Sequence, residues 1–120
     1  MIATEAPSDC VFCAIVGGTA PAEVVGETDT VVAFRDIAPV APTHVLVVPR
    51  RHIDDAATLG PQDGVVVASM FALAKAVAER DEVLQSGYRL VLNVGRHAQN
   101  SVGHLHLHVL GGRQMTWPPG

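Results

Sequence analysis

The chain has 120 residues, of which 48% are hydrophobic and 17% charged, and its net charge at pH 7 is −4. This length provides a single domain with one core, and the composition excludes a disordered chain. The negative charge and a single lysine argue against a protein that binds a phosphate backbone, so we expect no nucleic-acid partner.

Residues 1–9 lack the basic start and the apolar segment of a signal peptide, and we expect them to form a flexible lead-in. No apolar run approaches the roughly 20 residues of a membrane span, so we expect no membrane partner. The expected location is the cytoplasm, where a disulfide between the two cysteines is disfavoured.

The first half of the chain predicts a short helix followed by three strands. Residues 10–16 are apolar and end at two glycines, which predicts a two-turn helix with Ser8 or Asp9 as its N-cap. Residues 23–27 and 30–34 predict strands, and the second contains more β-branched and aromatic residues. A loop with two prolines covers 36–43, and the apolar run 44–48, which ends before Pro49, predicts a buried strand.

The second half predicts one long helix and two further strands. After a turn at 60–63, residues 65–83 have a helical pattern, and Ser86-Gly87 marks where a helix must have ended. Apolar residues in this segment recur every three or four positions, at Val66, Met70, Leu73, Ala74 and Val77. Residues 88–94 predict a strand, and residues 95–103 predict a polar loop. Residues 104–110 alternate with a period of two and predict a strand, and residues 111–120 predict a tail that contains the single tryptophan of the sequence. The predicted fold is α+β: an antiparallel sheet of about five strands, with one long helix and a short N-terminal helix.

Three of the six histidines occupy alternate positions, His104, His106 and His108. In a strand they share one face, about 6.6 Å apart, and the apolar residues between them face the core. Three imidazoles need polar partners, so this face is interpreted as a polar site rather than a solvated surface that carries histidines by chance. At bond lengths of about 2.1 Å, at most two of the three could share one metal ion. His97 is interpreted as a surface residue.

The polar loop before these histidines suits an anionic ligand. Its Asn100 and Ser101 offer neutral hydrogen bonds, and Gly103 allows the backbone to approach a ligand closely. Histidine can attack phosphorus directly while a second imidazole neutralises oxygen charge, so a phosphate is the expected ligand.

The sequence His104-Leu105-His106-Leu107-His108-Val109-Leu110 resembles the His-φ-His-φ-His-φ-φ signature of the histidine triad (HIT) superfamily. Residues 34–39, 41–44 and 49–53 resemble the middle segment of that family, so the resemblance covers nearly the whole chain. The ending Gly111-Gly112-Arg113-Gln114-Met115, followed by Trp117-Pro118-Pro119-Gly120, resembles the Hint branch of nucleoside phosphoramidases. The resemblance implies one HIT domain over residues 1–120, with 111–120 as its C-terminal tail.

The resemblance also implies a role for each site residue. His106 would be the nucleophile and His108 the group that stabilises phosphate charge, with Ser101 near the leaving group and His44 tuning protonation. Asp36 would hold the ribose hydroxyls, although an aspartate before this loop could simply cap a turn. Arg35 stands where animal members often have histidine and could alter base stacking. The residues implied to surround the base are Phe12, Ile15, Phe34 and Ile37, each of which could instead be core. The residues implied to line the ribose, the phosphate or the leaving group are Asn93, Gln99, Asn100 and Trp117. This chain departs from the family at Gln99-Asn100, where most members have Gly-Gln.

Cys10 and Cys13 form a C-x-x-C motif, which alone fits a zinc half-site, a redox pair or chance. Bacterial HIT proteins with this motif, and the related uridylyltransferases, imply a structural zinc held by Cys10, Cys13, His52 and His104. Free buried thiols are the alternative. The active-site strand itself implies no catalytic metal.

The function that the resemblance implies is hydrolysis of purine nucleoside 5′-phosphoramidates and related AMP or GMP conjugates through a nucleotidyl-histidine. The alternatives are a dinucleoside polyphosphate hydrolase of the Fhit type and a nucleotide-binding regulatory protein with vestigial catalysis. The helical segment is apolar over more than one stripe, which predicts a homodimer. By resemblance Trp117 would reach the partner's site; otherwise it would pack on its own domain.

Overall fold

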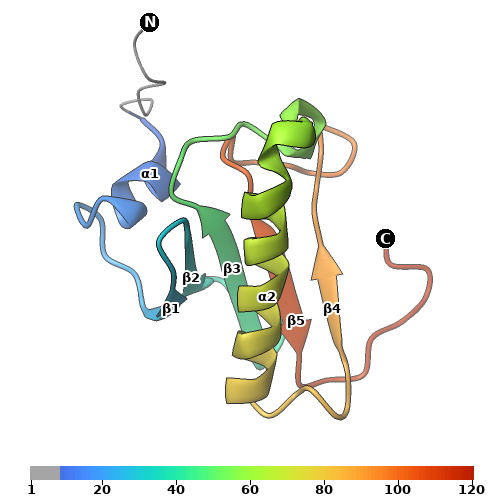
Figure 1. The fold of residues 1–120 in the computed structure, drawn as a ribbon. Coiled ribbons are helices and arrows are strands. Elements are labelled where there is room, and N and C mark those ends of the chain that lie inside the picture. The colour runs from blue at the N-terminus through green and yellow to red at the C-terminus, as the bar shows by residue number, and fades with distance from the viewer. Residues whose placement is uncertain (1–8) are drawn as a thin grey trace, which may run out of the picture.

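The computed structural model describes residues 9–120 and confirms the predicted α+β class. Residues 1–8 of the predicted lead-in at 1–9, including the possible cap Ser8, lie outside the described residues. Five antiparallel strands form one sheet in the order β1-β2-β3-β5-β4 (Figure 1). The elements are α1 (Val11–Val16), β1 (Val24–Glu27), β2 (Val31–Arg35), β3 (Thr43–Pro49), η1 (Ala56–Thr58), η2 (Pro61–Asp63), α2 (Gly64–Arg80), β4 (Tyr88–Val91) and β5 (Leu107–Gly111).

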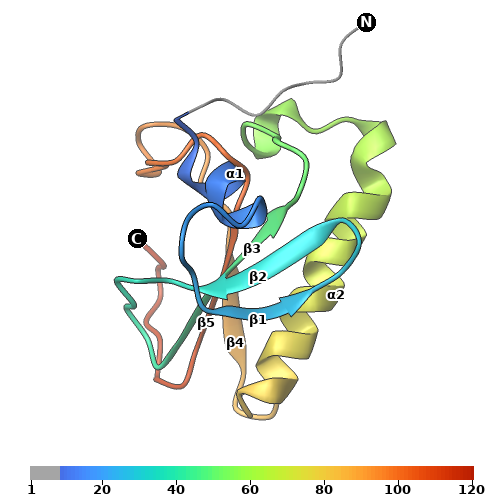
Figure 2. The ribbon, with the colours of Figure 1, turned by 90° about the vertical axis from the view of Figure 1, so that its left-hand side faces the viewer.

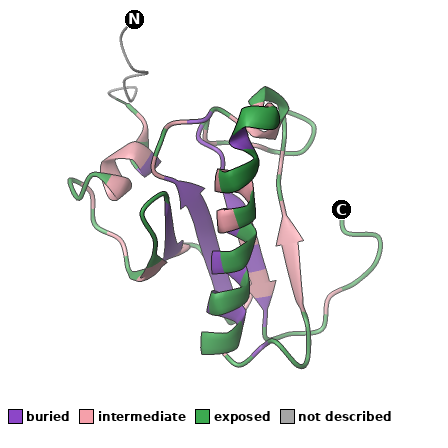
Figure 3. Cartoon of the chain, viewed as in Figure 1, coloured by how far each residue is buried: buried purple, intermediate pink, exposed green. Residues whose placement is uncertain are grey.

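The two helices cover opposite faces of the sheet, as the rotated view shows (Figure 2). Strand residues alternate between the faces because the side-chain period of a strand is two. Val45 and Val47 of β3 belong to the core under α2, whereas Leu46 and Val48 pack with Phe12 of α1. All seven residues of β3 are buried, so this strand is the centre of both cores (Figure 3).

Helix α2 has the predicted buried stripe but ends earlier than residue 83. Its last turn closes with two hydrogen bonds, from the Val83 amide to the Ala78 carbonyl and from the Glu82 amide to the Glu79 carbonyl. Glu82 takes the left-handed conformation, with φ of 60°, that such an ending requires and that glycine usually supplies. The predicted helix was too long at its C-terminal end, because residue 82 is a glutamate and not the glycine that usually indicates a helix end. Among residues 9–120, no helix is both long and apolar enough to cross a membrane.

Strand β5 begins at Leu107, three residues after the predicted start at His104. The register pairs Val47 with Leu107, so the next ladder positions toward the N-terminal end of β5 would involve Pro49. Proline has no amide hydrogen to donate, and the Leu105 amide donates to the Ile53 carbonyl instead. Strand β4 likewise ends at Val91, short of the predicted residue 94.

A half-buried ion pair links the end of α2 to the central strands. The Arg35 guanidinium donates two hydrogen bonds to the Asp81 carboxylate, at 2.7 and 2.9 Å, and the Thr43 hydroxyl donates a third at 2.8 Å. The Asp81 side chain is only 12% exposed. The hydrogen bonds from Arg35 lower the pKa of the Asp81 carboxyl, with Thr43 contributing further against the effect of burial.

Replacing Asp81 with asparagine is expected to destabilise the fold by about 2 kcal/mol at pH 7, because it removes the bidentate carboxylate and leaves the Arg35 guanidinium with the exposed Glu23 carboxylate, 3.7 Å away, as its charged partner. A lowered folded pKa contributes stability that is present above the unfolded value of about 3.9 and is lost as pH falls through the folded value. The difference between wild type and Asp81→Asn in urea unfolding should therefore shrink below about pH 4. Glu79→Gln, exposed on the same helix, is the control and should show no such difference. An unchanged difference at pH 2.5 would contradict this account.

Candidate active site and metal centre

The histidines share the sheet face that is opposite α2, as the period of two predicts. Leu107 and Val109 of β5 belong to the core under α2. His108 lies between them in the strand and pairs with Leu46 of β3, so its side chain is on the opposite face of the sheet. His44 pairs with Leu110, two residues beyond His108, so the His44 and His108 side chains are diagonal neighbours on that face. Their rings lie 5.2 Å apart between centroids.

His106 is held in the tautomer that suits a nucleophile. Its ring is only 8% exposed, and its Nδ1 lies 2.7 Å from the main-chain oxygen of His104. A carbonyl oxygen can only accept, so Nδ1 donates and Nε2 of the neutral ring keeps the free lone pair. The ring packs against Phe12 and His108, at centroid distances of 5.1 and 5.0 Å.

A chain of hydrogen bonds sets the opposite tautomer in His108. The Val40 amide donates to Nδ1 of His44 at 3.1 Å, so the proton of His44 is on Nε2. That Nε2 lies 2.9 Å from Nδ1 of His108 and 3.3 Å from the Asp36 carboxylate. When it donates to His108, the proton of His108 is on Nε2, where it is available to an anionic ligand.

Asp36, His44 and His108 are also residue types that ligate metals, and their ligand atoms lie within 4.8 Å of one another. The bond from the Val40 amide argues against a metal here, because it leaves Nε2 of His44 as a donor rather than a ligand. Asp36 also accepts the Ala38 amide at 2.8 Å, which is the turn cap considered as an alternative to ribose binding.

Burial keeps this histidine pair uncharged near neutral pH. It lowers the pKa of His108 to about 4, with the neighbouring His106 and His44 acting in the same direction. Burial also lowers the pKa of His44, although the Asp36 carboxylate opposes the change. His108 is therefore a neutral donor at pH 7.

The histidines open into a cavity of about 350 Å³, within the range for small-molecule sites. Its lining includes the polar residues His106, His108, Ser101 and Asp36, and most of the other lining residues are apolar. The predicted base-pocket residues are among these apolar residues: Phe12, Ile15, Phe34 and Ile37. Sequence reasoning missed Val11, Pro21, Ala22, Leu46 and Val102, which are small or apolar and carry no chemical signal. Arg35 also lines the cavity, and its guanidinium is held by Asp81 rather than left free to stack.

The other predicted nucleotide contacts do not line this cavity within the single chain. Asn93, Gln99 and Asn100 lie in or before the loop that precedes the histidines. The side-chain oxygen of Asn100 is buried and has no hydrogen-bond partner among residues 9–120. Trp117 is 81% exposed, so it is not tucked onto its own domain. His97 is exposed, as predicted.

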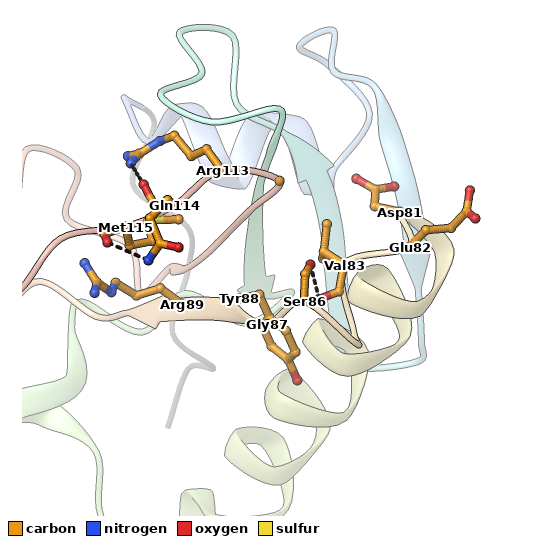
Figure 4. A pocket seen from close by; sticks show the side chains of 11 residues that line it. Asp81, Glu82, Val83, Ser86, Gly87, Tyr88, Arg89, Arg113, Gln114 and Met115 are labelled. Atoms are coloured by element: carbon orange, nitrogen blue, oxygen red, sulfur yellow. Dashed lines mark hydrogen bonds between the residues drawn. The ribbon is translucent and has the colours of Figure 1, made fainter.

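A larger cavity of about 660 Å³ lies at the end of α2, between β4 and the C-terminal tail (Figure 4). It contains none of the predicted site residues. Its two arginines bind main-chain oxygens, Arg89 that of Thr116 and Arg113 those of Val40 and Gln114. These bonds hold the tail in place, so the histidine cavity, despite its smaller volume, is the candidate active site.

The C-x-x-C motif and two histidines form a compact cluster: Cys10, Cys13, His52 and His104, with ligand atoms within 4.8 Å of one another. Nδ1 of His104 lies 3.3 Å from the Cys10 sulfur and 3.4 Å from the Cys13 sulfur, and Nδ1 of His52 lies 3.2 Å from the Cys13 sulfur. The N-cap of α1 is Cys10, whose sulfur accepts the Cys13 amide, so the predicted cap Asp9 is wrong.

The cluster fits a zinc ion by the chemistry of its donors. Nε2 of His52 binds the Asp54 carboxylate and Nε2 of His104 binds the Pro49 carbonyl, both at 2.9 Å. Both acceptors require a proton on Nε2, which leaves each Nδ1 lone pair facing the sulfurs, the outer-shell pattern of histidines that bind zinc. Burial raises the pKa of the Cys13 thiol to about 11, so without a metal this thiol is protonated at pH 7.

Comparison with known proteins gives consistent matches. The model of the HIT domain family matches residues 18–115. An uncharacterised HIT-like protein of Synechococcus elongatus is 40% identical over 112 residues, 93% of this chain and 97% of that protein. The crystal structure of a HIT family hydrolase from Legionella pneumophila has a TM-score of 0.91 at 46% identity, covering 93% of this chain and 100% of the other. A histidine triad protein from Clostridium difficile has a TM-score of 0.89 at 35% identity, with 93% and 97% covered.

Proposed function

This chain belongs to the HIT domain family, and from that premise we propose that it hydrolyses purine nucleoside 5′-phosphoramidates and related conjugates of AMP or GMP. The observation that carries the proposal is the pair of opposite tautomers at the cavity. His106 presents a lone pair on Nε2 and His108 presents a proton on Nε2. A nucleophile beside a neutral donor suits attack on a phosphorus atom whose oxygens gain charge.

In the proposed reaction, Nε2 of His106 attacks the α-phosphorus and the P–N bond breaks. The leaving amine takes up a proton from solvent beside Ser101, a lining residue that is exposed. The Nδ1–H of His106 stays on the His104 carbonyl and stabilises the positive charge of the nucleotidyl-histidine. Water then attacks the same phosphorus, releases the 5′-monophosphate and restores His106, while Nε2–H of His108 stabilises a phosphate oxygen in both steps.

The nucleotide would lie along the cavity with its base against the apolar wall formed by Phe12, Ile15, Phe34 and Ile37. Asp36 would accept hydrogen bonds from the ribose hydroxyls, because each carboxylate oxygen can accept further hydrogen bonds beyond those it makes in the fold. We assign Asn93, Gln99 and Asn100 to the ribose and phosphate side.

A panel of three substrates at equal concentration tests the proposal: adenosine phosphoramidate, guanosine phosphoramidate and diadenosine tetraphosphate. We expect kcat/KM for the phosphoramidates to exceed that for the dinucleotide. Faster cleavage of the dinucleotide would favour the alternative Fhit-type hydrolase. AMP binding without turnover of any of the three would favour a regulatory protein with vestigial catalysis.

We also propose a structural zinc at Cys10, Cys13, His52 and His104, the group for which the donor tautomers and outer-shell partners are in place. When bound, the ion would supply a cross-link between α1 and the histidine segment rather than a Lewis acid for the reaction. The reaction above requires no metal.

We further propose a homodimer of the Hint type. Exposed apolar side chains lie on α2 and after β4, including Val65 at 79%, Phe71 at 43% and Val94 at 41% exposure. Strand β4 is at the edge of the sheet, and one side of its backbone pairs with no other strand in the described part of the chain. A twofold contact across these surfaces would cover them, and the exposed Trp117 would be able to reach the partner's cavity.

Light scattering is expected to give twice the chain mass of 12.6 kDa. Deletion of residues 117–120 should lower kcat/KM more for phosphoramidates with bulky leaving groups than for the unsubstituted ones, because Trp117 would contact the leaving group in the partner's site. Circular dichroism of the truncated protein controls for folding. A monomer at micromolar concentration, or a uniform effect on all leaving groups, would contradict the proposal.

A further inference from the structure

The Cys/His cluster and the nucleophile share a wall formed by Phe12. Phe12 lies between the two cysteines in the sequence and is 7% exposed. Its ring contacts His104 of the cluster at 6.0 Å and His106 of the active site at 5.1 Å, both edge-on. The same ring lines the cavity. A change in the position of the cysteines would therefore move a group that touches both sites.

Helix α1 depends on the cluster for its polar attachment. In the described part of the chain, the hydrogen bonds that join residues 10–17 to anything beyond residue 20 are those from Cys10 and Cys13 to His52 and His104. The helix has only six residues, and isolated helices of this length are not stable in water. It nevertheless supplies three residues of the cavity wall: Val11, Phe12 and Ile15.

His104 provides a second connection. Its ring belongs to the cluster, whereas its main-chain oxygen accepts the Nδ1–H of His106 and so fixes the nucleophilic tautomer. The ring is fully buried and is held on its other side by the Pro49 carbonyl. A shift of the His104 ring would therefore move the backbone oxygen that orients His106.

Solvent reaches the cluster by a separate route. A cavity of about 360 Å³ is lined by Cys10 and His52 and shares Val11, Ser101 and Val102 with the histidine cavity. An ion could thus enter or leave while a nucleotide occupies the active site.

We propose that occupancy of the Cys10–Cys13–His52–His104 cluster positions Phe12 and His106, so that zinc and a nucleotide bind with positive coupling. The proposal rests on the nucleotide site and the zinc site proposed above. It makes Phe12 and His104 positioning residues for the nucleophile, and it makes the cluster a control element of the active site as well as a cross-link.

Thermodynamic linkage provides the test, because a coupling factor must be the same from both sides. Zinc affinity is measured by competition with a chelator, with and without saturating AMP, and AMP affinity is measured by calorimetry on zinc-loaded and zinc-stripped protein. We expect each ligand to bind about tenfold more tightly in the presence of the other. Equal affinities in the two states would overturn the proposal.

Two variants distinguish coupling from damage to the cavity. Phe12→Leu keeps an apolar side chain but removes the ring contacts, and we expect it to bind zinc while its coupling factor falls toward one. Ile37→Ala is the matched control, because Ile37 lines the same cavity, is 96% exposed and does not belong to the cluster. It should weaken AMP binding equally in both zinc states. A coupling factor that is unchanged in Phe12→Leu would exclude Phe12 as the connection.

A spectroscopic measurement separates this proposal from the proposed function. If AMP bound neither form, the nucleotide site would be refuted, and the ring ¹⁵N resonances of His106 would still report on coupling. We expect zinc addition to sharpen and shift them in wild type and to do so much less in Phe12→Leu. His106 resonances that do not respond to zinc would overturn the coupling even if AMP binds.

Discussion

Replacement of His106 by alanine is expected to lower turnover of adenosine phosphoramidate by at least roughly 10³-fold while leaving AMP binding within a few fold. The reason is that His106 holds the only histidine lone pair that the hydrogen-bond network leaves free at the candidate active site. Nε2 of His108 and Nε2 of His44 are both donors in this network, and Nδ1 of His106 is bound to a carbonyl. Steady-state kinetics and calorimetry with AMP measure the two effects.

Two controls make this result specific to the nucleophile. His97→Ala removes an exposed histidine that lines none of the cavities described above, and it should turn over at the wild-type rate. His106→Gly should regain part of its activity on addition of imidazole, which a misfolded protein would not. Near-normal turnover by a pure preparation of His106→Ala would exclude covalent catalysis by this residue.

The parts of the fold that were predicted are those set by local periodicity. The alternation at residues 104–109 placed the histidines on one face and Leu105, Leu107 and Val109 in the core. The spacing of Met70, Leu73 and Val77 likewise identified the buried stripe of α2. Both patterns follow from backbone geometry, so they hold whatever the element packs against.

The predictions that failed depend on partners distant in the sequence or on unusual local choices. The start of β5 is set by Pro49, nearly sixty residues earlier, which lacks the amide that would extend the ladder. The end of α2 is set by Glu82 in a conformation that usually requires glycine. The ion pair of Arg35 with Asp81 joins two elements whose contact no sequence period encodes.

At the candidate site, too, some features could be predicted from the sequence and others could not. Residue types and the family resemblance identified the histidines, Asp36 and the cysteines. The groups that decide the tautomers are main-chain atoms: the Val40 amide and the carbonyls of Pro49 and His104. Every residue carries such atoms, so no sequence pattern indicates which of them face an imidazole, and only the folded structure determines which histidine donates and which attacks.

The second large effect is expected from Cys13→Ser, which should abolish stoichiometric zinc binding and lower the melting temperature by roughly 10 °C. Cys13 contacts both histidines of the cluster, so its loss removes a thiolate ligand that no neighbour can replace. A ligand that binds only the folded state at 100 times its Kd stabilises that state by about 2.7 kcal/mol. For a domain of this size, about 1 kcal/mol corresponds to roughly 4 °C.

The fold is expected to survive this change, because the core under α2 does not involve the cluster. That core contains residues from β2, β3, β5 and α2, such as Val31, Val47, Leu107 and Met70. The loss of stability should therefore be confined to α1 and the segment around His104, and hydrogen exchange should increase there first.

Chelator provides the decisive control: it should lower the melting temperature of wild type to that of Cys13→Ser and leave the melting temperature of the variant unchanged. Elemental analysis should find about one zinc per wild-type chain purified without added metal. Negligible zinc in wild type would refute the zinc site, and a difference in melting temperature that persists in chelator would show that Cys13 stabilises the helix by packing.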